Sequence, residues 1–227
     1  MLRITTVALS TLLLTPASSL AQEAVDIGVI KNSERRVVQP LLYPKDGRTE
    51  IGIHLGVMPF DAYLVTPNLQ VSFDMHLSED FSISAVAGGG YGLKNGTYAE
   101  LESPAYGVAP DAYRYLSSAL VGATYSPIYA KMNLNGAKVI HFDVYGTARG
   151  GVTIEQSVIP KGGIAVAPTI SLGLGTRFFW GSKYALRVEI RDDAMIERRK
   201  LTATTHLKQN ANITVGFSFL SPVKERR

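Results

Sequence analysis

Residues Thr66–Leu77 read TPNLQVSFDMHL, and from Asn68 onward polar and apolar side chains alternate. The apolar set is Leu69, Val71, Phe73, Met75 and Leu77, and the polar set is Asn68, Gln70, Ser72, Asp74 and His76. Successive side chains of a β-strand point to opposite faces, so this stretch predicts a strand with one apolar and one polar face. The same period of two continues along the chain, and no stretch keeps a helical period of 3.6.

Along the rest of the chain the alternation predicts seven more strands, so that the full set of eight is Glu50–Met58, Thr66–Leu77, Asp80–Tyr91, Leu116–Tyr125, Val139–Val152, Ala167–Trp180, Tyr184–Asp192 and Ala211–Phe219. Ser78-Glu79 and Gly181-Ser182-Lys183 are tight turns, whereas the connections on the other side are long. The third connection on the side of the tight turns, Ser126–Lys138, is longer than the other two. It contains Asn135-Gly136, a strong turn dipeptide. Strand lengths and alternating connections predict an all-β fold, an eight-stranded antiparallel up-and-down transmembrane β-barrel over residues 49–220.

Alternation alone does not say which face lies outside, and a soluble lipocalin-like barrel would turn its apolar set inward. Three features favour a membrane barrel. The polar faces are rich in glycine and serine, which suits a crowded interior, and the apolar faces hold nearly no charge. Aromatic residues cluster near the strand ends, as in the girdles of membrane barrels: Phe60, Tyr63, Tyr91, Tyr125, Tyr129, Phe178, Phe179, Trp180, Tyr184 and Phe219.

The first residues are typical of an export signal. Arg3 precedes the short apolar run Val7–Leu14, and Ser19-Leu20-Ala21 is a small-x-small cleavage site. We therefore predict a signal peptide over residues 1–21, a periplasmic lead-in over 22–48 and a basic periplasmic tail over 221–227, in a protein of the Gram-negative outer membrane. The chain has no cysteine, and its 23 basic against 19 acidic residues are too evenly scattered to indicate nucleic-acid binding.

Several short motifs resemble one family. They are Arg36-Val37-Val38-Gln39, Pro59-Phe60-Asp61-Ala62-Tyr63, Ser126-Pro127-Ile128-Tyr129-Ala130-Lys131 and His141-Phe142-Asp143. Over roughly residues 35–220 the chain resembles the outer-membrane β-barrel domain proteins of myxobacteria and related deltaproteobacterial and predatory bacteria. The resemblance implies the fold and the location, and carries over no activity or catalytic residue. Asn212–Phe219 also resembles the aromatic-ended final strand read by the barrel-assembly machinery, although eight residues follow it.

The polar faces of the predicted strands carry titratable residues that would share the barrel interior: Glu50, His54, Asp74, His76, His141, Asp143, Arg149, Arg177, Arg187, Glu189 and Arg191. Buried charges must be paired, so we predict a salt-bridged plug that fills the interior. A narrow ion path lined by the same charges is the alternative. The histidine spacing matches no zinc motif and no Gly-x-Ser-x-Gly occurs, so we expect no metal, cofactor or enzymatic activity.

Gly92–Tyr115 is the longest predicted loop, and its tyrosines and acids make it the candidate surface for outside contacts, with Tyr98, Tyr106, Asp111 and Tyr113 as the predicted contact residues. The function predicted is thus a structural or interaction protein of the cell envelope. Its expected partners are outer-membrane lipid, the assembly machinery and an envelope protein complex. Two alternatives stay open: a narrow channel or component of an envelope export or motility complex, and a soluble periplasmic barrel that binds an apolar ligand.

Overall fold

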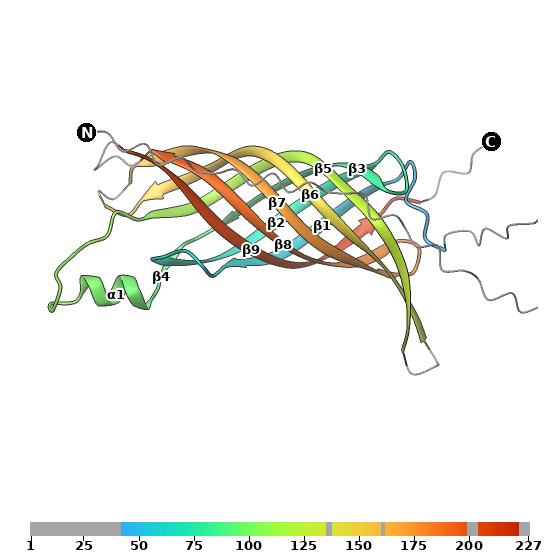
Figure 1. Cartoon of the computed structure of the whole chain (residues 1–227), viewed down its shortest axis with the longest axis horizontal. Helices are drawn as coiled ribbons and strands as arrows, with labels where there is room; N and C mark the ends of the chain where they lie inside the picture. Colours follow the sequence, from blue (N-terminus) through green and yellow to red (C-terminus); the bar gives the residue numbers. More distant parts are fainter. Residues whose placement is uncertain (1–41, 135–137, 160–161, 199–203, 223–227) are drawn as a thin grey trace, which may run out of the picture. The chain divides into compact units, whose positions relative to one another are not determined.

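The computed structural model describes residues 42–134, 138–159, 162–198 and 204–222 (Figure 1). The elements are β1 (Thr49–Met58), β2 (Leu64–His76), β3 (Phe81–Gly90), β4 (Leu93–Lys94), α1 (Gly96–Glu102), β5 (Tyr113–Leu134), β6 (Lys138–Ser157), β7 (Ile164–Trp180), β8 (Tyr184–Arg198) and β9 (Thr205–Leu220). Within these ranges no helix is long and apolar enough to cross a membrane. The predicted signal peptide, most of the predicted lead-in and the last five residues of the predicted tail lie outside the described residues.

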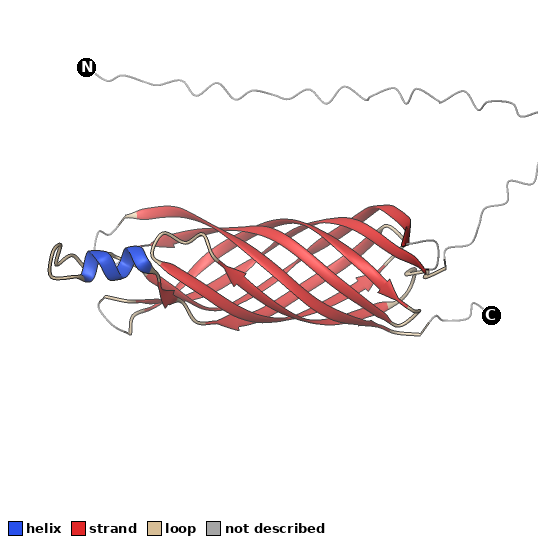
Figure 2. Ribbon diagram, turned by 90° about the horizontal axis from the view of Figure 1, so that it is seen from below, coloured by secondary structure: helices blue, strands red, loops and turns tan. Residues whose placement is uncertain are grey.

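Eight of the strands close into a ring. Each pairs antiparallel with its neighbour along the chain, in the order β1, β2, β3, β5, β6, β7, β8 and β9. β1 then pairs with β9, so that Ile53 lies opposite Val71 of β2 on one side and Phe217 of β9 on the other. The strands run at a tilt to the long axis of the barrel (Figure 2). This ladder confirms the predicted eight-stranded antiparallel up-and-down barrel, in which no sheet edge remains along the paired length.

The two ends of the barrel differ. One end, here called the turn end, carries the β2–β3, β5–β6 and β7–β8 connections, and the other, the loop end, carries the remaining four connections. β4 and α1 lie in the β3–β5 connection and extend past the loop end (Figure 1). At the turn end the buried Arg48 donates to the carbonyl oxygens of Ser221 and Ser182, both at 2.5 Å. Arg48 therefore ties both ends of the described chain to the β7–β8 turn.

The predicted connection Ser126–Lys138 was wrong. β5 continues to Leu134 and β6 begins at Lys138, so a two-stranded hairpin projects past the turn end (Figure 1). The ladder shifts register between Tyr125 and Ile128, which places Pro127 in a bulge. A bulge tolerates a residue without a backbone N–H, so the proline does not end the strand there. The Asn135-Gly136 dipeptide lies outside the described residues.

The strands at the loop end are also longer than the alternation predicts. The predicted loops Thr153–Val166 and Asp193–Asn210 are largely paired backbone, because β6 reaches Ser157 and β8 pairs with β9 out to Arg198 and Thr205. Polar side chains occupy both faces of these extensions, for example Arg198 and Lys208. The period-two hydropathy pattern therefore stops before the hydrogen-bonded ladder does.

The outer wall of the barrel is apolar and the inner wall is polar. On β2, Leu69, Val71 and Phe73 are 52%, 50% and 45% exposed, whereas the residues between them are buried. The same pattern holds on β7, where Ile170, Leu172 and Leu174 are more than 60% exposed. A soluble barrel with an apolar interior has the opposite arrangement, so the alternative of a lipocalin-like ligand binder was wrong.

Aromatic side chains ring the turn end of the outer wall. The exposed members are Phe81, Tyr125, Trp180, Tyr184 and Phe219, and the rings of Tyr184 and Phe219 are 5.7 Å apart. Two residues expected in this girdle lie elsewhere. They are Phe179, which is buried, and Tyr129, which is half-buried and packs against it. The side chain of Phe179 points inward because of its position in the alternation of β7, and it also packs with Tyr43.

Candidate functional site: the filled interior and the mouth of the barrel

Arg187 of β8 is the centre of the interior. Its guanidinium forms a short ion pair with Asp74 of β2, lies 3.3 Å from a Glu50 oxygen and 3.6 Å from a Glu189 oxygen. All four side chains are at most 7% exposed. Glu50 and Asp74 come from β1 and β2, so this one arginine crosses the interior to strands that lie two and three positions away from β8 around the ring.

Glu189 extends the network toward the loop end. Arg149 of β6 donates from both terminal nitrogens to its two oxygens, at 2.7 and 3.3 Å, and uses Nε to donate to Ser84 at 3.0 Å. Such a bidentate pair fixes the orientation of both groups as well as their distance. Arg191 lies 3.8 Å from Glu189 and 3.2 Å from Asp193, so the chain of charges continues along β8.

The network also reaches the turn end. Arg177 lies 3.2 Å from Glu50 and 3.5 Å from Asp143, and the Nζ of Lys45 lies 2.6 Å from the same Asp143. His76 forms a 3.0 Å contact with Glu50. Lys45 precedes β1 in the chain, and its buried side chain closes the interior from this end.

Tyr145 of β6 fills the space between the arginines. Its ring lies 5.2 Å from the guanidinium carbon of Arg177 and 5.0 Å from that of Arg187, and its hydroxyl donates to Glu189 at 3.1 Å. The ring needs the glycine at position 175 on the neighbouring strand, because a Cβ there would lie 2.4 Å from the ring carbon that bears the hydroxyl. Gly175 thus provides the room for a fully buried aromatic ring among charges.

All eleven residues that the sequence placed inside the barrel are buried in the structure. Nine of them form the ion network described above. The other two do not join it, since His54 hydrogen-bonds to Ser72 at 2.8 Å and His141 to Tyr129 at 3.1 Å. Sequence analysis missed Lys45 and Asp193, which were placed in the lead-in and in a loop. With them the network contains five acids and five Lys or Arg side chains, so it is balanced in charge without the histidines.

The predicted contact loop is only partly a surface. Tyr98 lies on α1 and is fully buried against Leu64 and Ala112, and Tyr113 is 3% exposed, so neither ring lies on the outer surface of the loop. The carboxylate oxygens of Asp111 are buried as well. Of the four predicted contact residues, Tyr106 is exposed, at 61%. Tyr98 is buried because it packs in a small core with Leu64 of β2 and Ala112, against which Tyr63 and Val158 also lie.

A second cluster of charges lies at the loop-end mouth, and sequence analysis did not find it. Lys208 of β9 lies 2.9 Å from Asp61, 3.4 Å from Glu155 and 3.1 Å from Glu197. Burial raises the pKa of Glu155 to about 8, with the nearby Glu197 adding to the rise and Lys208 opposing it. Burial disfavours the charge of Lys208, but its three acidic neighbours outweigh this effect and raise the pKa of the ammonium group.

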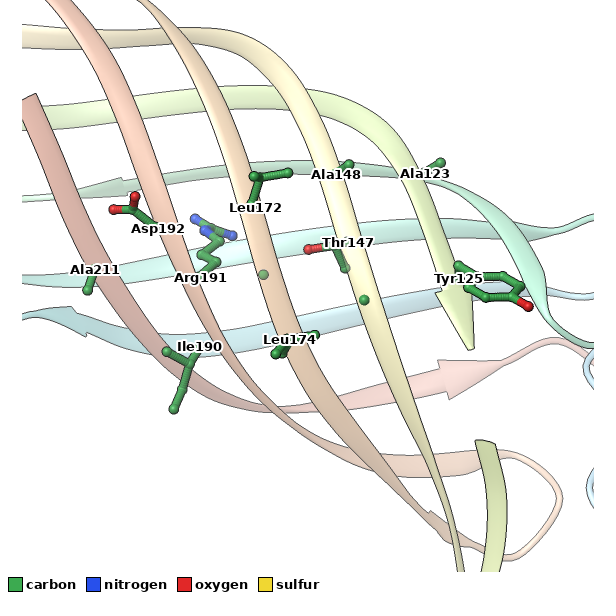
Figure 3. A pocket seen from close by; sticks show the side chains of 12 residues that line it. Ala123, Tyr125, Thr147, Ala148, Leu172, Leu174, Ile190, Arg191, Asp192 and Ala211 are labelled. Carbon is green, nitrogen blue, oxygen red and sulfur yellow. The ribbon is translucent and has the colours of Figure 1, made fainter. Parts of the chain in front are cut away.

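The outer wall has a shallow depression of about 800 Å³ where β6 carries small residues. Its lining includes Gly146 and Ala148 of β6. Leu172, Leu174 and Ile190 of β7 and β8 also line it (Figure 3). On β8, Ile190 and Asp192 lie on the outside, whereas Arg191 between them points into the barrel. Among the described residues, no three histidine, aspartate or glutamate side chains are placed to hold a metal ion.

Comparisons with known proteins give similar structures only. Neither a protein-family model nor a curated protein matches this chain. The attachment invasion locus protein Ail of Yersinia pestis is 10% identical, with a TM-score of 0.42 over 78% of this chain and 99% of Ail. Neisserial surface protein A is 7% identical, with a TM-score of 0.39 over 76% of this chain and 95% of that one. A major outer membrane protein from Thermus thermophilus is 7% identical, with a TM-score of 0.36 over 76% and 99%.

Proposed function

We propose that this protein is an outer-membrane β-barrel whose interior is closed by its own side chains and which serves the cell envelope as a structural or interaction protein. Support for the membrane location comes from the outer wall, which is apolar around the ring and bordered by aromatic residues at the turn end. Such a surface is costly in water and favourable in hydrocarbon. Closure of the ring agrees with this location, because an open edge in lipid leaves backbone groups unpaired.

The observation that carries the proposal is the charge-balanced network across the interior. Arg177 and Arg187 are fully buried and join the walls through Glu50, Asp74 and Asp143. Moving these groups apart to admit an ion would leave buried charges without partners, at a cost of several kcal/mol. The network therefore favours a plug over the narrow channel that the same residues could have lined.

Single-channel recording in planar bilayers tests this proposal. The purified full-length protein is expected to show no steady open state, and a double variant, Arg177→Ala with Arg187→Ala, is expected to show ion flow if it inserts. A matched control, Lys94→Ala, removes an exposed cation at the loop end and should stay silent. Steady conductance of the unaltered protein would refute the plug. Recovery of the protein in the soluble periplasmic fraction would refute the membrane location.

The turn end is the expected side of the periplasm, because short connections and both chain ends lie on that side in barrels of this kind. The loop end then faces outward, and exposed apolar residues such as Tyr106 and Val108 offer the contact surface there. Envelope lipid and the assembly machinery remain the partners we propose, together with an envelope protein complex.

A further inference from the structure

The loop-end mouth contains a cavity of about 220 Å³. Asp61 and Tyr63 of the β1–β2 loop, Asp111 and Tyr113 before and at the start of β5, and Glu197, Lys208 and Asn210 of β8 and β9 line it. Water occupies about 30 Å³ per molecule in the liquid, so the cavity could hold several waters or one small ligand. It lies beyond the apolar part of the outer wall, on the side of the barrel where the long loops are.

Three buried oxygen atoms of residues that line the cavity accept no hydrogen bond from the described residues. Both carboxylate oxygens of Asp111 are buried and accept no hydrogen bond. Asn210 is 3% exposed, and its side-chain oxygen accepts none either. A buried polar atom without a partner costs about 1–3 kcal/mol, so these three oxygens favour a ligand that brings N–H or O–H donors.

The charge of the lining points to a cation. Asp61, Asp111 and Glu197 face the cavity with Lys208 as the single basic side chain in its lining. Lys208 is already shared between Asp61, Glu197 and the more deeply buried Glu155. No cation of the described residues lies within ion-pair distance of Asp111, which leaves this carboxylate as the group without a counter-charge.

The arrangement suits an organic cation better than a metal ion. A divalent metal requires several oxygen ligands at about 2.0–2.6 Å from one point, and the described acidic side chains do not converge in this way. Tyr63 and Tyr113 instead give the cavity aromatic surface, which pairs well with methylene groups and with an ammonium group. We infer that the loop-end cavity, whose lining includes Tyr63 and Tyr113, is a binding site for a primary alkylammonium group held by Asp111 and Asn210.

This inference goes beyond the proposed function and does not depend on a closed interior, so each can fail alone. The test is isothermal titration of the full-length protein, folded in detergent, with 1,4-diaminobutane at constant ionic strength. We expect saturable binding to one site and none for 1,4-butanediol, which has a similar shape but no charge. The same titration is made with capped lysine amide. Tighter binding of this compound than of the diamine would indicate that the natural ligand is a lysine side chain of a polypeptide. Weaker binding would indicate a free amine.

Asp111→Asn is the decisive variant, because it removes the charge and none of the contacts in the unliganded protein. A hydrogen bond to a charged group contributes about 1.5–3 kcal/mol, so affinity for the diamine should fall at least tenfold. Asp80→Asn makes the same change at the turn end, where Asp80 is exposed, and should leave binding unchanged. The diamine should also raise the thermal midpoint of the unaltered protein and not that of Asp111→Asn.

Three results would overturn the site. The first is that the unaltered protein shows no saturable binding of the diamine. The second is that Asp111→Asn binds the diamine as tightly as the unaltered protein does. The third is that low millimolar magnesium chloride displaces the diamine when sodium chloride at equal ionic strength does not. The last of these would mean that the oxygens bind metal.

Discussion

Replacing Arg187 by methionine should destabilise the barrel strongly. Among the described residues Arg187 is the only cation within ion-pair distance of Asp74, whereas Glu50 keeps Arg177 and Glu189 keeps Arg149. The main cost is thus one buried carboxylate left alone, and breaking a buried pair in this way costs about 3–5 kcal/mol. Adding Asp74→Asn removes that uncompensated charge, so the double variant should recover a large part of the loss.

Urea unfolding in phospholipid vesicles measures these changes. Trp180 is the only tryptophan of the chain and is 74% exposed at the rim of the outer wall, so its fluorescence reports the loss of lipid contact on unfolding. Lys94→Met is the control, because its ion pair with Glu102 is solvent-exposed and should contribute less than about 1 kcal/mol. The reasoning is refuted if Arg187→Met changes the free energy of unfolding by less than about 1 kcal/mol, or if the double variant is as unstable as the single one.

Three further predictions concern the interior, the mouth and the outer wall. Gly175→Val should lower the free energy of unfolding by about 1–3 kcal/mol, because the valine clashes with Tyr145, and adding Tyr145→Ala should relieve part of that loss. Equal urea midpoints for Gly175→Val and the unaltered protein would contradict this prediction. The raised pKa of Glu155 means that the folded state holds this proton more tightly than the unfolded state does, so its contribution to stability is full below about pH 4.5 and is lost as the pH rises toward about 8. Glu155→Gln should flatten this dependence in unfolding curves at pH 5, 6.5 and 8, with Glu197 and Lys208 retained, and an identical slope in both proteins would count against it. Leu172→Arg on the outer wall should cost about 2–4 kcal/mol in vesicles, and a cost near zero would place Leu172 away from the bilayer.

The sequence predicts the barrel well where one face meets apolar surroundings. Between Leu69 and Met75 each outward residue is apolar and each inward residue polar, so the period of two marks the strand and its parity. The same parity identifies the interior. On β8, Arg187, Glu189 and Arg191 alternate with apolar residues, and all three charged side chains are buried.

The sequence predicts the strand ends poorly, because polar residues on both faces remove the pattern while the hydrogen bonds continue. Extending the parity of β8 past Arg191 would have placed Asp193 and Glu197 inside. No comparable signal exists for the mouth. Asp61, Glu155 and Lys208 lie far apart in the sequence and meet only because the ring closes. The burial of Tyr98 also depends on tertiary packing, since its helix is only seven residues long.

Nitroxide scanning of β2 in vesicles measures which face of the barrel wall meets lipid. The chain has no cysteine, so single cysteines at Leu69, Gln70, Val71, Ser72 and Phe73 can each be labelled without background. We predict that labels at 69, 71 and 73 collide readily with oxygen dissolved in the lipid and rarely with a water-soluble nickel chelate, and that labels at 70 and 72 collide little with either. Free access of the nickel chelate to positions 70 and 72 would show a water-filled interior, and the loss of the alternation in oxygen access would show that the apolar face does not meet lipid.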